Sequence, residues 1–158
     1  MSRKRTRRRV VIPMAPRGLR PKLTRDQVRD LAICHLQNLD AVAFGDADEG
    51  TLWQIVGAVL TWSRVAEMLQ LGAPEMIEQM NLVESLIKRF GEHGKVRFTG
   101  TEYQLARAGV DVMDQLAETV DMPTAVIAAE WSEARVNKLE AACRERDLIA
   151  GQRAEATL

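Results

Sequence analysis

Charge is segregated along this chain, and the segregation separates a part that can build a core from a part that cannot. Ten of the 22 basic residues precede Asp26, whereas all 22 acidic residues lie at or after that position. The formal net charge of zero is therefore a cancellation between a basic start and an acidic remainder. Because crowded cations cannot be buried together, residues 1–9 are expected to be disordered in isolation.

An extended basic arm is predicted over residues 1–22. Its prolines, Pro13, Pro16 and Pro21, favour extended backbone and exclude a regular helix. Fully stretched at about 3.3 Å per residue, the arm would reach roughly 70 Å, far enough to wrap a partner or cross to a neighbouring subunit. The rest of the chain is expected to form a helical globular domain over 23–150 and a frayed tail over 151–158.

The composition of the body predicts one domain with an aliphatic core. Apolar residues make up 46% of the chain and aromatic residues only 4%, a balance typical of packed helices. Cys34 and Cys143 lie more than a hundred residues apart within helical patterns, which predicts two buried thiols rather than a disulfide. Neither a secretory segment nor a membrane span is expected, so the predicted location is cytoplasmic.

Apolar residues at helical spacing predict an all-α fold, a bundle of roughly five helices. The expected helices cover about 24–45, 48–71, 74–91, 101–121 and 123–149. The second helix is apolar around most of its circumference and leaves only a narrow strip of polar and small residues, which predicts a central position. Trp53 and Trp62 lie on opposite sides of this helix, so one is expected in the main core and the other in a second core layer or an exposed patch.

Local motifs predict where the helices begin and end. Thr24 with Gln27 matches a capping box at the start of the first helix, and Thr101 with Gln104 matches one at the start of the fourth. Gly91 is expected to end the third helix. The glycine-rich segment 91–100 that follows it predicts a short strand or an ordered loop.

The arm contains the residues for which a binding role is predicted. Clustered arginine and lysine neutralise phosphates and release condensed counterions, which gives salt-sensitive, sequence-independent binding to nucleic acid. Arginine predominates, which favours bidentate phosphate contacts, and no aromatic residue is present to stack on bases. The candidate phosphate-binding residues are Arg3, Lys4, Arg5, Arg7, Arg8, Arg9, Arg17, Arg20 and Lys22.

No catalytic residue, cofactor or metal site is predicted in the body, so a non-enzymatic protein is expected. His35 and His93 have no cysteine, histidine or carboxylate at metal-ligand spacing. Cys34 and His35 are consecutive in a helix, so their side chains diverge by about 100° and do not form a nucleophile–base pair. Cys34 is expected to be half-buried and His35 to lie at the flank of the helix.

Three functions are consistent with this organisation. The leading hypothesis is a small protein that binds the phosphate backbone of DNA or RNA through its arm, while the acidic body oligomerises or recruits a partner. The alternative is a protein–protein interaction module or inhibitor whose arm clasps an acidic protein surface, with exposed apolar residues of the second helix completing the contact. The third is self-assembly in which the arm of one copy lies on the body of the next. No membrane partner is expected.

Overall fold

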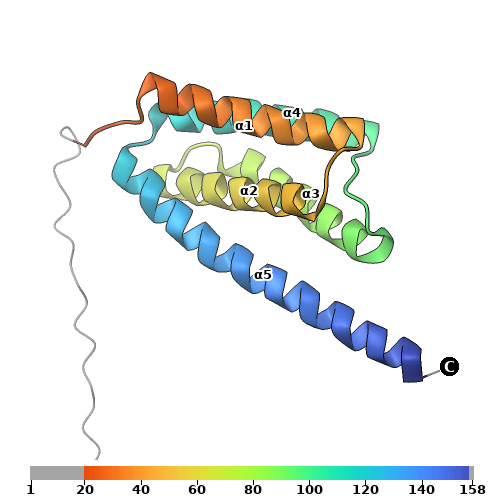
Figure 1. The fold of residues 1–158 in the computed structure, drawn as a ribbon. Helices are drawn as coiled ribbons and strands as arrows, with labels where there is room; N and C mark the ends of the chain where they lie inside the picture. Colours follow the sequence, from red (N-terminus) through yellow and green to blue (C-terminus); the bar gives the residue numbers. More distant parts are fainter. Residues whose placement is uncertain (1–19, 157–158) are drawn as a thin grey trace, which may run out of the picture.

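The computed structural model describes residues 20–156, which form five α-helices and no strand (Figure 1). The helices are α1 (Arg25–Phe44), α2 (Glu49–Leu69), α3 (Ala73–His93), α4 (Gly100–Thr119) and α5 (Met122–Ala156). The predicted all-α bundle is confirmed.

The helices are arranged around α2. α1 and α4 lie side by side and antiparallel, α2 and α3 form a second antiparallel pair, and α5 crosses α2 on the outside (Figure 1). α2 packs against each of the other four helices, which confirms its predicted central position. Trp53 and Trp62 are both buried, and Met68 is the one large apolar side chain of α2 that is exposed. Of the two positions predicted for the second tryptophan, the exposed patch is therefore wrong, and both tryptophans lie in the core.

α5 covers the narrow polar strip of α2. Val136 contacts the backbone of α2 at Gly57, where a Cβ would lie 3.7 Å from Val136 Cγ2. One turn away along α2, the hydroxyl oxygens of Thr61 and Ser132 are hydrogen-bonded at 2.6 Å. Small side chains along the strip let the two helices approach closely, and the buried hydroxyls satisfy each other. α2 thus packs against another helix even on its least apolar side.

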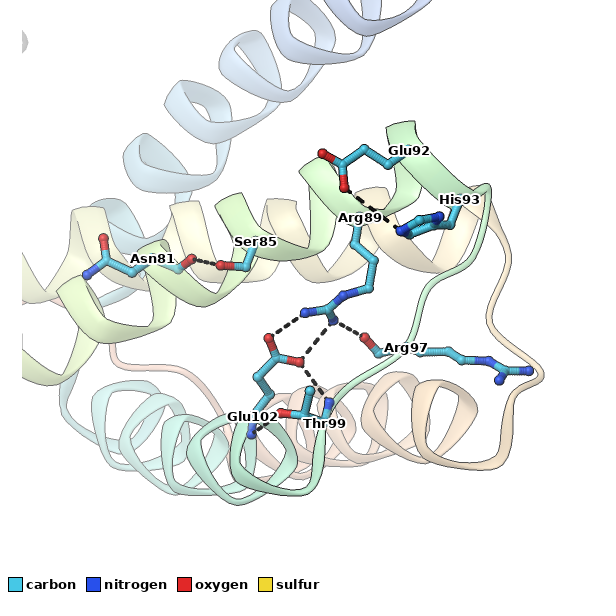
Figure 2. Close-up of polar contacts among 8 residues, drawn as sticks. All are labelled: Asn81, Ser85, Arg89, Glu92, His93, Arg97, Thr99 and Glu102. Carbon is cyan, nitrogen blue, oxygen red and sulfur yellow. Dashed lines mark hydrogen bonds and ion pairs between the residues drawn. The ribbon is translucent and has the colours of Figure 1, made fainter.

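An ion pair at the end of α3 determines where α4 begins. Thr99 is the N-cap of α4 and forms a capping box with Glu102 (Figure 2). Arg89 of α3 donates to both carboxylate oxygens of Glu102, at 2.7 and 2.9 Å, and to the carbonyl oxygen of Arg97. The hydrogen bond from Arg89 lowers the pKa of Glu102, so the cap stays ionised at neutral pH. The capping box predicted at Thr101 is wrong.

The connection between α3 and α4 is an ordered loop. α3 continues through Gly91, where it was expected to end, and stops at His93 because Gly94 adopts a left-handed φ of 65°. That conformation, which glycine adopts without a steric penalty, ends the helix, whereas a glycine within a helix is tolerated. Val96 in the loop is buried in the main core, so the loop alternative is correct and the strand is not formed.

α5 is longer than the sequence predicts. It continues through Gly151 to Ala156, across most of the segment expected to fray. The neighbours of this glycine, including Ala150 and Arg153, are strong helix formers that offset the cost of one glycine.

α3 and α4 approach closely at Gly109. A Cβ at this position would overlap the side-chain amide of Gln79. Gln79 is 3% exposed and donates from Nε2 to the carbonyl oxygen of Leu105 at 2.9 Å, so its amide is held in place. Packing between the two helices, and not backbone conformation, therefore requires glycine here.

Thr99→Ala should lower the free energy of unfolding by about 1 kcal/mol, since it removes the N-cap of α4. Thr101→Ala is the matched control, because Thr101 lies exposed in the first turn and caps nothing. Urea unfolding of both variants tests the assignment. A larger loss in Thr101→Ala than in Thr99→Ala would restore the cap predicted from sequence.

Gly109→Ala should destabilise the protein by about 1–3 kcal/mol through overpacking against Gln79. Combining it with Gln79→Ala should cost less than the sum of the two single substitutions, because the second removes the obstruction. Strict additivity in a double-mutant cycle measured by urea unfolding would contradict the close approach.

Candidate functional site

The last residues of the arm are fixed to the body beside the turn between α4 and α5. Arg20 forms an ion pair with Asp121 at 3.8 Å, with 11% of the Arg20 side chain exposed. The Met122 amide donates to the carbonyl oxygen of Pro21 at 2.7 Å. The backbones of Lys22 and Asp121 form an isolated antiparallel β-bridge. The arm therefore has a defined root, formed by residues 20–22.

Two of the candidate phosphate-binding residues, Arg20 and Lys22, lie in the root of the arm. Lys22 is exposed, whereas the side chain of Arg20 is largely buried against Asp121. Arg20 therefore anchors the arm in this structure, and phosphate binding by Arg20 and by Lys22 stays a prediction. The other candidates lie outside the described residues, so their role stays a prediction: Arg3, Lys4, Arg5, Arg7, Arg8, Arg9 and Arg17.

The body to which the arm is fixed is acidic. Within residues 20–156, acidic residues outnumber basic ones by 22 to 15. A surface with this balance repels phosphate at low ionic strength. Contact with a polyanion is therefore favoured at the arm.

A second candidate surface is a groove along α2 between α3 and α5. These two helices both pack on α2 but make few contacts with each other, which leaves the groove open between them. We call it the α3–α5 groove. One half is lined by Val56, Leu60, Met80, Val83, Glu84, Ile87, Arg135, Lys138 and Leu139, and the other by Ser63, Arg64, Glu67, Ala73, Met76, Ile77, Met80 and Trp131.

The α3–α5 groove has an apolar floor and a charged rim. Glu84 stands on the α3 side, and Arg135 and Lys138 stand on the α5 side. An apolar floor between charged walls is the arrangement that receives an amphipathic helix.

Trp131 lies at one end of the groove beside two arginines. The guanidinium carbons of Arg64 and Arg135 lie 5.4 and 4.6 Å from the centre of its ring, within range of cation–π attraction. Arg64 also pairs with Glu67. Even so, Arg64 Nε and Ser63 Oγ are buried without a hydrogen-bond partner among residues 20–156. Buried polar atoms normally have a hydrogen-bond partner, so these two atoms are exceptions to that rule.

His35 and Cys34 take positions opposite to those predicted. His35 is 7% exposed and accepts a hydrogen bond at Nε2 from Trp62 Nε1 at 3.2 Å, whereas Cys34 is exposed. The indole N–H satisfies Nε2 of the imidazole, which makes a histidine more acceptable on the buried face of α1, whereas Nδ1 has no hydrogen-bond partner among residues 20–156. Cys143 is half-buried, so the expectation of two buried thiols is wrong for Cys34.

His35 also faces a carboxylate that resists ionisation. Its Nδ1 lies 3.8 Å from Asp114 Oδ1, too far for a hydrogen bond. Burial lowers the pKa of His35, so the ring is neutral at pH 7. Burial, with the nearby charges of Asp111 and Glu118, raises the pKa of Asp114. The interior cavity that His35 lines with Leu39 and Met113, of about 40 Å³, is too small for an organic ligand. His35 also lines an open groove of about 450 Å³ with Cys34 and Trp62.

No protein-family model, curated protein or solved structure matches the chain. Among residues 20–156, no group of three or more histidine, cysteine or carboxylate side chains could hold a metal ion. None of the described helices is long and apolar enough to cross a membrane. The geometry itself points to two surfaces, the rooted arm and the α3–α5 groove.

The α3–α5 groove was not predicted from the sequence. Trp131 and Arg135 are four residues apart on one helix, a spacing that could have indicated their contact. Arg64 comes from α2, and no local spacing connects it to Trp131.

Acidification should destabilise the protein through His35. Because its pKa is lower in the folded state than the ordinary 6.5, the unfolded chain binds a proton that the folded protein does not. The free energy of unfolding should therefore fall as the pH drops below about 6.5, by at most about 1.4 kcal/mol per pH unit. Asp114 acts in the opposite direction nearer its ordinary pKa of 3.8, because its pKa is raised in the folded protein.

The check is urea unfolding at about pH 7.5 and about pH 5.5 for the wild type and for His35→Gln, which keeps an acceptor for Trp62 without titrating in this range. The variant should lose part of the pH dependence. His93→Gln controls for replacing an exposed histidine. An unchanged pH dependence in His35→Gln would contradict this account.

Proposed function

We propose that the protein binds the phosphate backbone of nucleic acid, without sequence specificity, through its Arg-rich arm, and that the acidic helical body serves self-association or partner recruitment. In this proposal it acts in the cytoplasm. The observation that carries the proposal is the root of the arm, which fixes the basic segment at one place on an acidic body. The arm then holds phosphate while the body stays outside the contact.

Electrostatics supports this division of roles. Clustered cations gain affinity by releasing the counterions that condense on nucleic acid, whereas the excess of acidic residues on the body opposes binding there. If about six arm cations engage duplex phosphates, the logarithm of the binding constant should fall with the logarithm of salt concentration with a slope near −5.

Removal of residues 1–19 should abolish this binding. The truncated chain begins at Arg20 and keeps the root intact, so its fold should be unchanged. Fluorescence anisotropy with labelled duplex DNA and with RNA, over a series of salt concentrations, measures both affinity and slope. Equal binding by the full chain and the truncated chain would contradict the proposal.

A pair of charge-matched variants makes the test specific to the arm. Arg7→Gln, Arg8→Gln and Arg9→Gln together should make the salt slope shallower by about 2–3, since each phosphate contact contributes about 0.9. The control combines three exposed body residues, Lys88→Gln, Lys95→Gln and Arg107→Gln, with the same change in net charge. Similar losses in both variants would show that net charge, and not the arm, determines binding.

The alternative is an interaction module or inhibitor whose arm clasps an acidic protein surface. One observation favours it: Arg20 already binds a protein carboxylate, that of Asp121. In the same assay, this alternative predicts no nucleic-acid binding by the full chain and salt-sensitive, arm-dependent binding to an acidic protein.

A further inference from the structure

Another groove lies along α2, between α1 and α5. These two helices begin near the same end of the molecule and diverge along their length (Figure 1). Both pack on α2 and make few contacts with each other, which leaves open the groove of about 450 Å³ that His35 lines. We call it the α1–α5 groove. Its α1 wall runs from Leu31 to Asn38 and its α5 wall from Ala129 to Asn137.

The α1–α5 groove is an apolar surface that solvent can reach. Its floor is the strip of small side chains on α2, where Gly57, Ala58 and Thr61 are only half-buried. Small side chains let another chain come close to the helix, and Trp53 and Trp62 add aromatic surface to the lining. Covering an apolar surface of this kind is favourable, because it removes the surface from water.

Charge distinguishes the α1–α5 groove from the α3–α5 groove. Glu133 is the one charged side chain among the described residues that line the α1–α5 groove. The cations Arg64, Arg135 and Lys138 line the α3–α5 groove instead. A segment with cations at both ends and no carboxylate is therefore attracted to the first groove and repelled by these cations at the second.

We propose that residues 10–16 of the arm lie in the α1–α5 groove of the same chain. They belong to the part of the chain outside the described residues. The inference goes beyond the proposed function and does not depend on the binding of nucleic acid. It assigns the contact with the body to the apolar residues of the arm, and it leaves the basic residues between Arg3 and Arg9 available for phosphate.

The sequence of residues 10–16 fits an apolar groove. They read Val-Val-Ile-Pro-Met-Ala-Pro, the longest uncharged run of the arm, and basic residues flank them at Arg9 and Arg17. Pro13 and Pro16 have the Pro-x-x-Pro spacing of segments that bind aromatic-lined grooves as extended polyproline helices. The prolines restrict the backbone before binding, so less conformational entropy is lost when the segment docks.

The groove also offers hydrogen bonds to an extended backbone. A polyproline segment has no internal hydrogen bonds, so its amide and carbonyl groups need partners outside the segment. Asn38, Gln54 and Asn137 line the groove, and each side-chain amide can both donate and accept. The open side of the groove leaves the remaining backbone groups of the segment in contact with water.

The root of the arm places residues 10–16 within reach of the groove. Ala129 and Asn137 come eight and sixteen residues after Asp121, about 12 and 24 Å along α5. Residue 10 is ten residues from Arg20, so it can reach about 33 Å from the root. The difference of about 9 Å leaves length for the chain to turn toward the groove, which Gly18 permits. A tether this short gives a local concentration in the millimolar range, which favours the arm of the same chain over that of a second copy.

The thiol of Cys34 reports on the occupancy of the groove. Cys34 is exposed and lines the α1–α5 groove, whereas Cys143 is half-buried and lies outside it. The experiment measures alkylation of both cysteines by uncharged N-ethylmaleimide, resolved by mass spectrometry of peptides. Cys34 should react about tenfold more slowly in the full chain than in the chain beginning at Arg20, as for a site that is filled about 90% of the time. Cys143 is the internal control and should react equally in both.

Uncharged substitutions in the arm make the test specific to the apolar segment. Val11→Asn with Ile12→Asn should raise the rate at Cys34 in the full chain to that of the truncated chain, since it removes the apolar contacts. Ser2→Asn with Thr6→Asn is the matched control and should react like the wild type. Neither pair belongs to the described helices, so neither changes the core. Equal rates in all three full-length chains, or equal acceleration by both pairs, would overturn the proposal.

A charge reversal in the groove tests its electrostatic part. Glu133→Lys should expose Cys34 in the full chain, because it repels the cations on either side of residues 10–16. Glu130→Lys, an exposed position of α5 outside the groove lining, makes the same change in charge and should have a smaller effect. Repeating both in the chain beginning at Arg20 removes the direct effect of the new lysine on the thiol. Equal effects of the two substitutions in the full chain would contradict docking beside Glu133.

Two further readouts separate this contact from other interactions of the arm. Protection of Cys34 should not change with protein concentration, and protection that grows with concentration would place the arm of a second copy in the groove and overturn the proposal. Val11→Asn with Ile12→Asn should keep the salt slope of duplex DNA binding, since no charge is altered. Failure of the docking and failure of the proposed function therefore give different results.

Discussion

The central position of α2 is the constraint on which the rest of the structure depends. Four helices pack against it, and its polar strip contacts α5 at Gly57 and Thr61. α3 and α5 are held on α2 and not on each other, so the groove between them is a direct consequence of this arrangement. Cys143 of α5 packs against the main core, and the helix continues from there to Ala156.

The fold could be predicted from the sequence wherever a local rule decides it. The Thr24 capping box and the apolar circumference of α2 are local signals, and the structure confirms both. The start of α4 could not be predicted, because two capping patterns overlap at Thr99 and Thr101. The choice between them is made by Arg89, ten residues before Thr99.

Long-range contacts explain the other differences between the structure and the predictions made from the sequence. A histidine on an apolar face is acceptable at position 35 because Trp62, on another helix, donates to it. Gly109 shows no signal in its own helix, since the clash that requires glycine comes from Gln79 on α3. For the binding surfaces, the basic arm was evident from charge alone, but the ion pair of Arg20 could not be predicted, because its partner Asp121 is about a hundred residues away.

Asp121 contacts both the arm and α5. Its carboxylate accepts a hydrogen bond from the Thr124 amide in the first turn of α5 and pairs with Arg20, so the residue just before α5 also fixes the root of the arm. The central claim is that foreign polyanions meet the arm and leave the helical body untouched. The most direct measurement is backbone nuclear magnetic resonance of the isotope-labelled full chain during a titration with duplex DNA. The account predicts that signal changes concentrate in residues 1–22, with the helices unaffected. Changes centred on the helices, or no change in the arm, would contradict it.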